Sequence, residues 1–125
     1  MKLHASQNSG LNIFTSYGHG YVSVNGVRYE SSVLVVPRGD VRLWHVADPD
    51  ALVQDDFQLL ANLRPELVLL GTGETLRFPH PRTLMTLTAA GIGTEVMDSR
   101  AACRTYNILA GEGREVAAAL ILPGA

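Results

Sequence analysis

Residues 94–122 read TEVMDSRAACRTYNILAGEGREVAAALIL, and this stretch decides the fold. Its first residues, Thr94–Met97, predict a short strand. Asp98 is a good N-cap, because its carboxylate can accept hydrogen bonds from the free backbone N–H groups of a first helical turn. We therefore expect a helix from this residue through Ala110, ended by the glycine that follows. Arg114–Leu122 then predicts a last strand, since its second half is wholly apolar.

The segment before this stretch repeats the alternation of strand and helix. Glu66–Leu70 predicts a short apolar strand, and Pro81–Ala90 predicts a helix that Gly91 closes as its C-terminal cap. Such alternation indicates a parallel or mixed sheet covered by helices. The apolar residues of these elements are expected to form one core: Leu67, Val68, Leu69, Leu70, Val96, Leu109, Ala118, Leu120 and Ile121.

A further amphipathic helix is predicted between Asp48 and Pro65. Asp48 suits the N-cap and Pro49 the first helical position. Apolar residues then recur at helical spacing, which predicts a surface helix with one buried stripe. The stripe consists of Val53, Phe57, Leu60 and Ala61.

The first part of the chain is typical of strands. Asn25-Gly26 predicts a tight hairpin turn, because both central positions of that turn need a positive φ. These strands either join the main sheet or form a small layer of their own. They are expected at Leu11–Tyr17, Tyr21–Val24, Val27–Tyr29, Ser32–Val36 and Arg42–His45.

The composition indicates a single domain over residues 1–125, with 46% hydrophobic and 18% charged residues, which excludes intrinsic disorder. Ten basic and twelve acidic residues give a net charge of −2, divided evenly between the halves of the chain. Without a basic stripe, nucleic acid is not an expected partner. The longest apolar run, Val116–Leu122, is too short to insert in a membrane.

Cysteine usage and the N-terminus predict a cytoplasmic protein. Cys103 is the only cysteine, so no intramolecular disulfide can form, and we expect a small buried or half-buried thiol. The first ten residues lack the apolar region of a secretory signal.

No sequence motif predicts catalysis, and we expect no catalytic residue, metal site or cofactor. The four histidines lack metal-ligand spacing, and no nucleophile elbow is present. Four G-x-G units lie at junctions, where glycine mostly serves turns. Gly71-Thr72-Gly73 is the one unit that we keep as a candidate ligand-binding loop. It directly follows a strand, where open α/β sheets usually bind ligands.

The helix after Asp98 carries the second candidate feature. Ala101, Ala102, Thr105, Tyr106 and Leu109 gather on the side expected to face the sheet, and Arg100, Cys103, Arg104 and Asn107 gather on the other. Arg100 and Arg104, four residues apart, repel unless a negative group lies near. That negative group is either an internal glutamate (Glu74, Glu95 or Glu112) or a bound anion. The candidate ligand-binding residues are Gly71, Thr72, Gly73, Arg100, Arg104 and Asn107.

The run VMDSRAACRTYNIL at Val96–Leu109, continuing as GEGR at Gly111–Arg114, is distinctive. Together with LLGTG at Leu69–Gly73 and the triplet Gly91-Ile92-Gly93, it resembles a widespread small family of uncharacterised proteins. That family includes the mitochondrial NADH:ubiquinone oxidoreductase (complex I) assembly factor 3 and an adipogenesis-associated domain protein of animals. The resemblance implies a compact three-layer α/β fold around a mixed sheet, without an established enzymatic activity.

Two functions follow as expectations. The first is a non-enzymatic interaction or assembly-factor-like module with a protein partner; a homo-oligomer is also open. The second is an enzyme or binder of a small anionic ligand, with Gly71–Gly73 and Arg100 or Arg104 holding the anion. We favour the first, because catalytic motifs are missing and charge is scattered.

Overall fold

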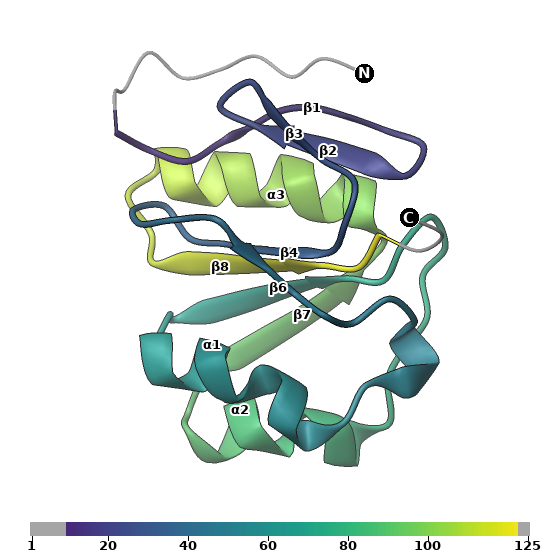
Figure 1. The fold of residues 1–125 in the computed structure, drawn as a ribbon. Helices are drawn as coiled ribbons and strands as arrows, with labels where there is room; N and C mark the ends of the chain where they lie inside the picture. Colours follow the sequence, from purple (N-terminus) through teal and green to yellow (C-terminus); the bar gives the residue numbers. More distant parts are fainter. Residues whose placement is uncertain (1–9, 123–125) are drawn as a thin grey trace.

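A five-stranded mixed sheet forms the centre of the computed structural model, which describes residues 10–122 (Figure 1). Its strands are β4 (Val33–Val35), β5 (Arg42–Leu43), β6 (Leu67–Gly71), β7 (Gly93–Met97) and β8 (Val116–Leu120). The spatial order is β5-β4-β8-β6-β7. The predicted mixed α/β class is confirmed. The expectation about a secretory signal concerns residues 1–9, which lie outside the described residues.

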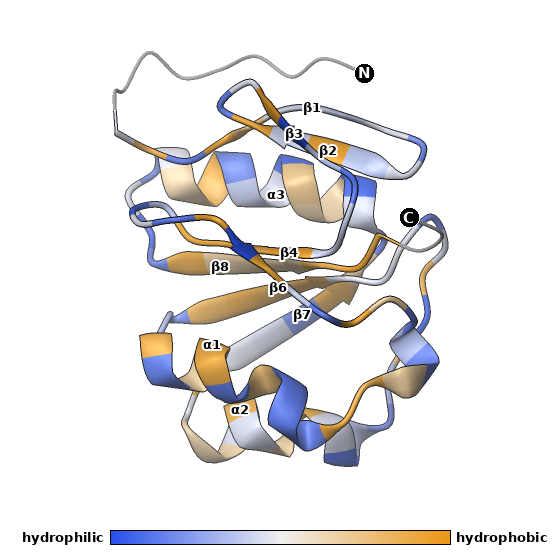
Figure 2. Cartoon of the chain, in the orientation of Figure 1, coloured by the Kyte–Doolittle hydropathy of each residue, from blue (hydrophilic) through white to orange (hydrophobic). Residues whose placement is uncertain are grey.

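The last strand, β8, lies in the middle of this sheet. It runs parallel to β6 and antiparallel to β4, so it joins the two halves of the chain. All of its residues are buried, because helices or strands cover both faces. Its wholly apolar sequence, VAAAL, is what a strand buried on both sides requires. Figure 2 shows β8 in orange and tan along its length, whereas α3 carries blue, hydrophilic positions as well.

The sheet separates two apolar clusters, so the expected single core is in fact two. Leu69, Ala118 and Leu120 point to the side of α3 (Ser99–Gly111). Val68 and Leu70 point to the opposite side, because side chains alternate along a strand. All nine predicted core residues belong to one of the two clusters or pack against it. Leu67 and Leu109 pack against the first, and Ile121 and Val96 belong to or pack against the second.

A separate antiparallel sheet covers the outer side of α3 (Figure 1). It consists of β1 (Phe14–Gly18), β2 (Tyr21–Val24) and β3 (Val27–Tyr29). The predicted turn is present, with φ of 50° at Asn25 and 84° at Gly26. Both expectations for the first half therefore hold in part: three strands form their own layer, whereas β4 and β5 join the main sheet.

This outer sheet corrects the predicted faces of α3. The N-cap is as predicted, since Asp98 Oδ1 accepts a hydrogen bond from Ala101 N at 2.9 Å. Part of the side expected to be opposite the core is, however, covered, whereas Arg100 and Arg104 are exposed. Cys103 is fully buried, and Asn107 is hydrogen-bonded to Phe14. The helix is packed on two sides because β1–β3 fold back over it, which helical periodicity alone cannot reveal.

The predicted helix between Asp48 and Pro65 is wrong as a single element. It is broken into η1 (Pro49–Ala51), η2 (Gln54–Phe57) and α1 (Gln58–Leu63), with extended backbone at Leu52 and Val53. The break buries Leu52 and leaves Val53 56% exposed. Asp56 Oδ2 accepts a hydrogen bond from Val53 N at 2.8 Å, and this bond caps the start of η2.

The other helical segment covers the same face of the sheet. The predicted helix at Pro81–Ala90 is present as η3 (Pro81–Leu84) followed by α2 (Met85–Ala89), and Gly91 ends it with a φ of 76°. The main sheet thus lies between α3 on one face and α1 with α2 on the other (Figure 1).

Candidate functional site

The chain leaves β6 through Gly71, a position that only glycine can occupy. A Cβ atom there would lie 2.8 Å from Leu120 Cδ2 and 2.9 Å from the Cα of Ser99. The backbone of β6 therefore touches the first residue of α3. This close approach brings the loop after β6, residues 72–80, against the N-terminal end of the helix.

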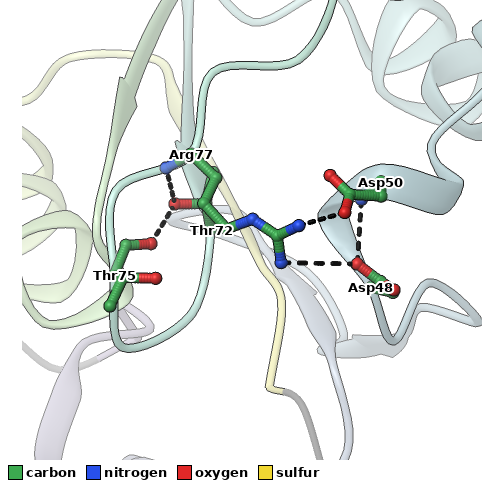
Figure 3. A network of polar contacts seen from close by, with 5 residues as sticks. All are labelled: Asp48, Asp50, Thr72, Thr75 and Arg77. Carbon is green, nitrogen blue, oxygen red and sulfur yellow. Dashed lines mark hydrogen bonds and ion pairs between the residues drawn. The ribbon is translucent and has the colours of Figure 1, made fainter.

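Thr72 organises the start of this loop (Figure 3). Its side chain is buried, and its hydroxyl donates to the carbonyl oxygen of Thr75 at 2.8 Å. The same oxygen accepts from the backbone N–H of Arg77 at 3.0 Å. Both roles of the hydroxyl are thus used inside the protein, which folds the loop into a tight turn.

Gly73 is tied to α3 and to the end of β8. Its N–H donates to Ser99 Oγ at 2.9 Å, and Ser99 Oγ donates to the carbonyl oxygen of Ile121 at 3.0 Å. In return, Ser99 N donates to the carbonyl oxygen of Gly73 at 2.8 Å. Ser99 therefore joins three segments at this edge of the sheet.

The tip of the loop carries two exposed apolar side chains around an ion-paired arginine. The Arg77 guanidinium binds the carboxylate of Asp50 and lies 3.6 Å from that of Asp48 (Figure 3). Leu76 is 50% exposed and Phe78 is 74% exposed. The loop is thus joined to the neighbouring η1 while it presents apolar groups to solvent.

Arg100 and Arg104 both lie beside Tyr17 of β1. Their guanidinium carbons are 6.0 Å and 5.9 Å from the centre of its ring, and Arg104 Nη1 donates to Tyr17 Oη at 2.6 Å. Among residues 10–122, neither arginine forms an ion pair with a carboxylate. Glu74, one of the expected counter-charges, binds His19 instead.

Asn107, the last predicted site residue, connects helix and hairpin. Its Oδ1 accepts from Phe14 N at 2.9 Å, and its Nδ2 donates to Phe14 O at 2.8 Å. The Asn107 side chain therefore uses both its oxygen and its nitrogen to hold β1 against α3.

A small cavity of about 60 Å³ adjoins these groups. Of the six predicted residues, Gly73 and Arg100 line it, whereas Gly71, Thr72, Arg104 and Asn107 do not. The other walls come from the β1–β2 turn and from the end of β8. The fold thus brings the loop after β6 and the first residues of α3 together at one edge of the main sheet. The β1–β2 hairpin forms a third wall of the cavity.

The buried nucleophile is poorly suited to reaction. Burial raises the pKa of the Cys103 thiol from 9.0 to about 12, against the opposing effect of nearby Arg104. Thiolate, the reactive form, is therefore scarce at neutral pH. The predicted buried thiol is confirmed. Within residues 10–122, no three His, Cys, Asp or Glu side chains cluster as metal ligands would.

Sequence reasoning missed four residues of this region: Tyr17, Leu76, Arg77 and Phe78. Of these, only the triplet formed by the last three was recognisable in the sequence. The triplet Leu76-Arg77-Phe78 places two large apolar residues in a segment that matches neither helix nor strand, and such residues are often exposed. Tyr17 gave none, because its position over the arginines depends on how the hairpin packs.

Comparisons with known proteins find a matching family model, relatives of similar sequence and solved structures of similar fold. A family model described as "Protein of unknown function (DUF498/DUF598)" matches residues 14–121. Assembly factor 3 of the NADH dehydrogenase [ubiquinone] 1 alpha subcomplex from Mus musculus is 34% identical over 110 residues, which cover 86% of this chain and 59% of the relative. The chain thus spans about three-fifths of the length of that relative.

A bacterial relative and a solved structure extend this likeness. The "13 kDa major membrane protein" of Francisella tularensis is 32% identical over 76 residues, covering 61% of this chain and 62% of the relative. The crystal structure of a protein from Bordetella parapertussis superposes with a TM-score of 0.86 at 43% identity. It covers 93% of this chain and 98% of that one. In the described part of the chain, no helix has the length and apolar character needed to cross a bilayer.

Proposed function

This chain belongs to the DUF498/DUF598 family of proteins of unknown function, and on that premise we propose that it is a non-enzymatic protein-interaction module that assists the assembly of a multi-subunit complex. The names of the mammalian relatives support this role, since they are assembly factors for NADH dehydrogenase. The partner would then be a protein subunit rather than a nucleic acid. We retain the cytoplasm as its predicted location.

The observation that carries the proposal is the apolar tip of the loop after β6. Leu76 is 50% exposed and Phe78 is 74% exposed. Moving a large apolar side chain out of water lowers the free energy, so this exposure is unfavourable unless a partner covers the two side chains. Aromatic side chains are frequent anchors at the centre of protein interfaces. Phe78 therefore has the chemistry of an anchor that a partner's apolar pocket would bury.

The loop is also held in place, which favours binding. Thr72 closes its base, and Arg77 joins its tip to Asp50. A loop already ordered before binding loses less conformational entropy when the partner arrives. The polar groups near the sheet edge serve this internal order, so they support a binding surface more than a catalytic centre.

The small-ligand alternative is supported by one specific feature, the pair Arg100 and Arg104. Two arginines near one ring could bind a carboxylate or phosphate. The adjoining cavity is small, at about 60 Å³. That volume favours a group on a larger partner over an enclosed metabolite.

The proposal is tested by capture from the organism's own cells. Tagged wild-type protein and a double variant, Leu76→Ser with Phe78→Ser, are cross-linked in vivo and their partners are quantified by mass spectrometry. Leu43→Ser is the matched control, because Leu43 is 71% exposed on the distant edge strand β5. We expect specific subunits to be lost from the double variant only.

Equal capture by the double variant and the control would contradict the proposal. Light scattering of the purified protein distinguishes a second copy of the chain from a different partner. If the wild type is a homo-oligomer and the double variant Leu76→Ser with Phe78→Ser is a monomer, the loop is a self-association surface instead.

A further inference from the structure

The N-terminal half of α3 presents two arginines to one aromatic ring. Arg100 and Arg104 lie one helical turn apart, and both guanidinium groups are about equally far from the Tyr17 ring, at 6.0 Å and 5.9 Å. The ring's negative face attracts each cation, but it does not remove their mutual repulsion. Arg104 is further oriented by its hydrogen bond to Tyr17 Oη.

Two carboxylates near these arginines, Glu74 and Asp98, have other partners. Glu74 lines the same cavity as Arg100 but binds His19. Asp98 caps the helix through Ala101 N. By contrast, Arg28, Arg77 and Arg114 each form an ion pair with a described carboxylate. The two arginines on Tyr17 thus present donors for a negative group that the described residues do not supply.

The shape of the surface limits what that group can be. Both arginines are exposed, and the cavity beside Arg100 is small, at about 60 Å³. Gly73 and Glu74, which line the cavity, belong to the same loop as Leu76 and Phe78. An occupant of the arginine site would therefore approach the apolar tip as well.

We propose that Arg100 and Arg104 bind side-chain carboxylates of an acidic segment in the protein partner. Arginine's planar fork suits carboxylate, and two forks near one ring suit neighbouring acidic side chains on an extended peptide. This inference rests on the proposed function, because it assigns the chemistry of the partner that the apolar loop would dock. The partner segment then combines acidic residues with an apolar one.

The test is an NMR titration of the ¹⁵N-labelled protein with an acetylated, amidated hexaglutamate peptide. We expect saturable shifts at the Nε–Hε signals of Arg100 and Arg104, which weaken as NaCl rises from about 50 mM to about 300 mM. The double variant Arg100→Gln with Arg104→Gln should lose roughly tenfold or more in affinity. Arg42→Gln with Arg82→Gln removes the same charge elsewhere and should change the affinity little.

Two outcomes overturn the inference. Equal loss in both double variants would mean nonspecific charge attraction, and tighter binding of citrate than of hexaglutamate would assign the site to a small molecule. The titration uses no cellular partner, so its failure leaves the proposed function standing if Leu76 and Phe78 remain necessary for capture. Conversely, normal peptide binding with no Leu76- or Phe78-dependent capture would refute the docking loop and leave the arginine site intact.

Discussion

Asn107 of α3 forms two hydrogen bonds with the backbone of Phe14, accepting from its N–H at 2.9 Å and donating to its carbonyl oxygen at 2.8 Å. These residues are 93 positions apart in the chain. The amide thus substitutes for a neighbouring strand at β1 and attaches the outer sheet to the helix. Phe14 is fully buried and packs edge-on against Tyr106, with ring centres 5.1 Å apart.

Replacement of Asn107 should detach the outer sheet. Asn107→Ala leaves a buried N–H and carbonyl group without partners, which we expect to cost about 1–3 kcal/mol in the free energy of unfolding. Urea denaturation measures the loss, and hydrogen exchange should quicken first in β1 and β2. Ile108→Ala, at a 61% exposed neighbour on α3, is the control and should change little.

Leu69 is the test of the central sheet. It is fully buried in β6 between β7 and β8, facing α3. We expect Leu69→Ala to cost roughly 2–5 kcal/mol, because it removes apolar contacts and leaves a cavity. An unchanged chemical-denaturation midpoint would mean that the strand is not central to stability.

Gly71 should tolerate no side chain. In Gly71→Ala the new methyl group would lie 2.9 Å from the Cα of Ser99, and backbone cannot move aside as a flexible side chain can. We expect a loss of about 1–3 kcal/mol, measured by thermal or urea unfolding. Gly20→Ala is a useful comparison, since its added methyl meets no atom within 4 Å and only its φ of 74° opposes the change. Equal stability of Gly71→Ala and wild type would contradict the close approach.

Arg77 should affect the loop more than the fold. Its ion pair with Asp50 is exposed, so Arg77→Gln should lower the free energy of unfolding by less than about 1 kcal/mol. Hydrogen exchange in residues 74–80 should nevertheless accelerate, and capture of the partner should weaken. Unchanged exchange in that loop, with Arg82→Gln as the reference, would show that Thr72 alone holds it.

Cys103 should be dispensable for folding at neutral pH, yet visible in alkaline unfolding. Cys103→Ala removes one buried sulfur, so we expect a loss of about 1 kcal/mol. In the folded state the thiol pKa rises from 9.0 to about 12, so the protonated form is favoured by folding. That contribution is fully present below about pH 9 and is lost as pH rises towards 12.

The pH dependence of Cys103 is read from urea midpoints of wild type and Cys103→Ala. The wild type should lose more stability than the variant between about pH 8 and about pH 10.5. Burial also raises the pKa of Tyr106, which gives both proteins a shared alkaline loss. Parallel curves would therefore show that the thiol ionises freely, and a variant that fails to fold at neutral pH would show that Cys103 is essential.

Much of the architecture is local, and the sequence by itself determined it. The cap at Asp98, the turn at Asn25-Gly26 and the helix end at Gly91 depend on a few neighbouring residues. The apolar run at the end of the described chain predicted a strand, and the structure shows that this strand, β8, is buried along its whole length. The glycine loop after β6 was likewise identifiable from its place behind an apolar strand.

Only the tertiary structure decided which surfaces these elements share. Helical periodicity placed Cys103 and Asn107 opposite the core, but β1–β3 cover that side through contacts far apart in sequence. The break at Leu52 likewise depends on long-range burial, which outweighs the local preference for one continuous helix. The position of Tyr17 beside Arg100 and Arg104 has the same cause, because the packing of a hairpin on a helix is set by side chains that the linear pattern does not bring together.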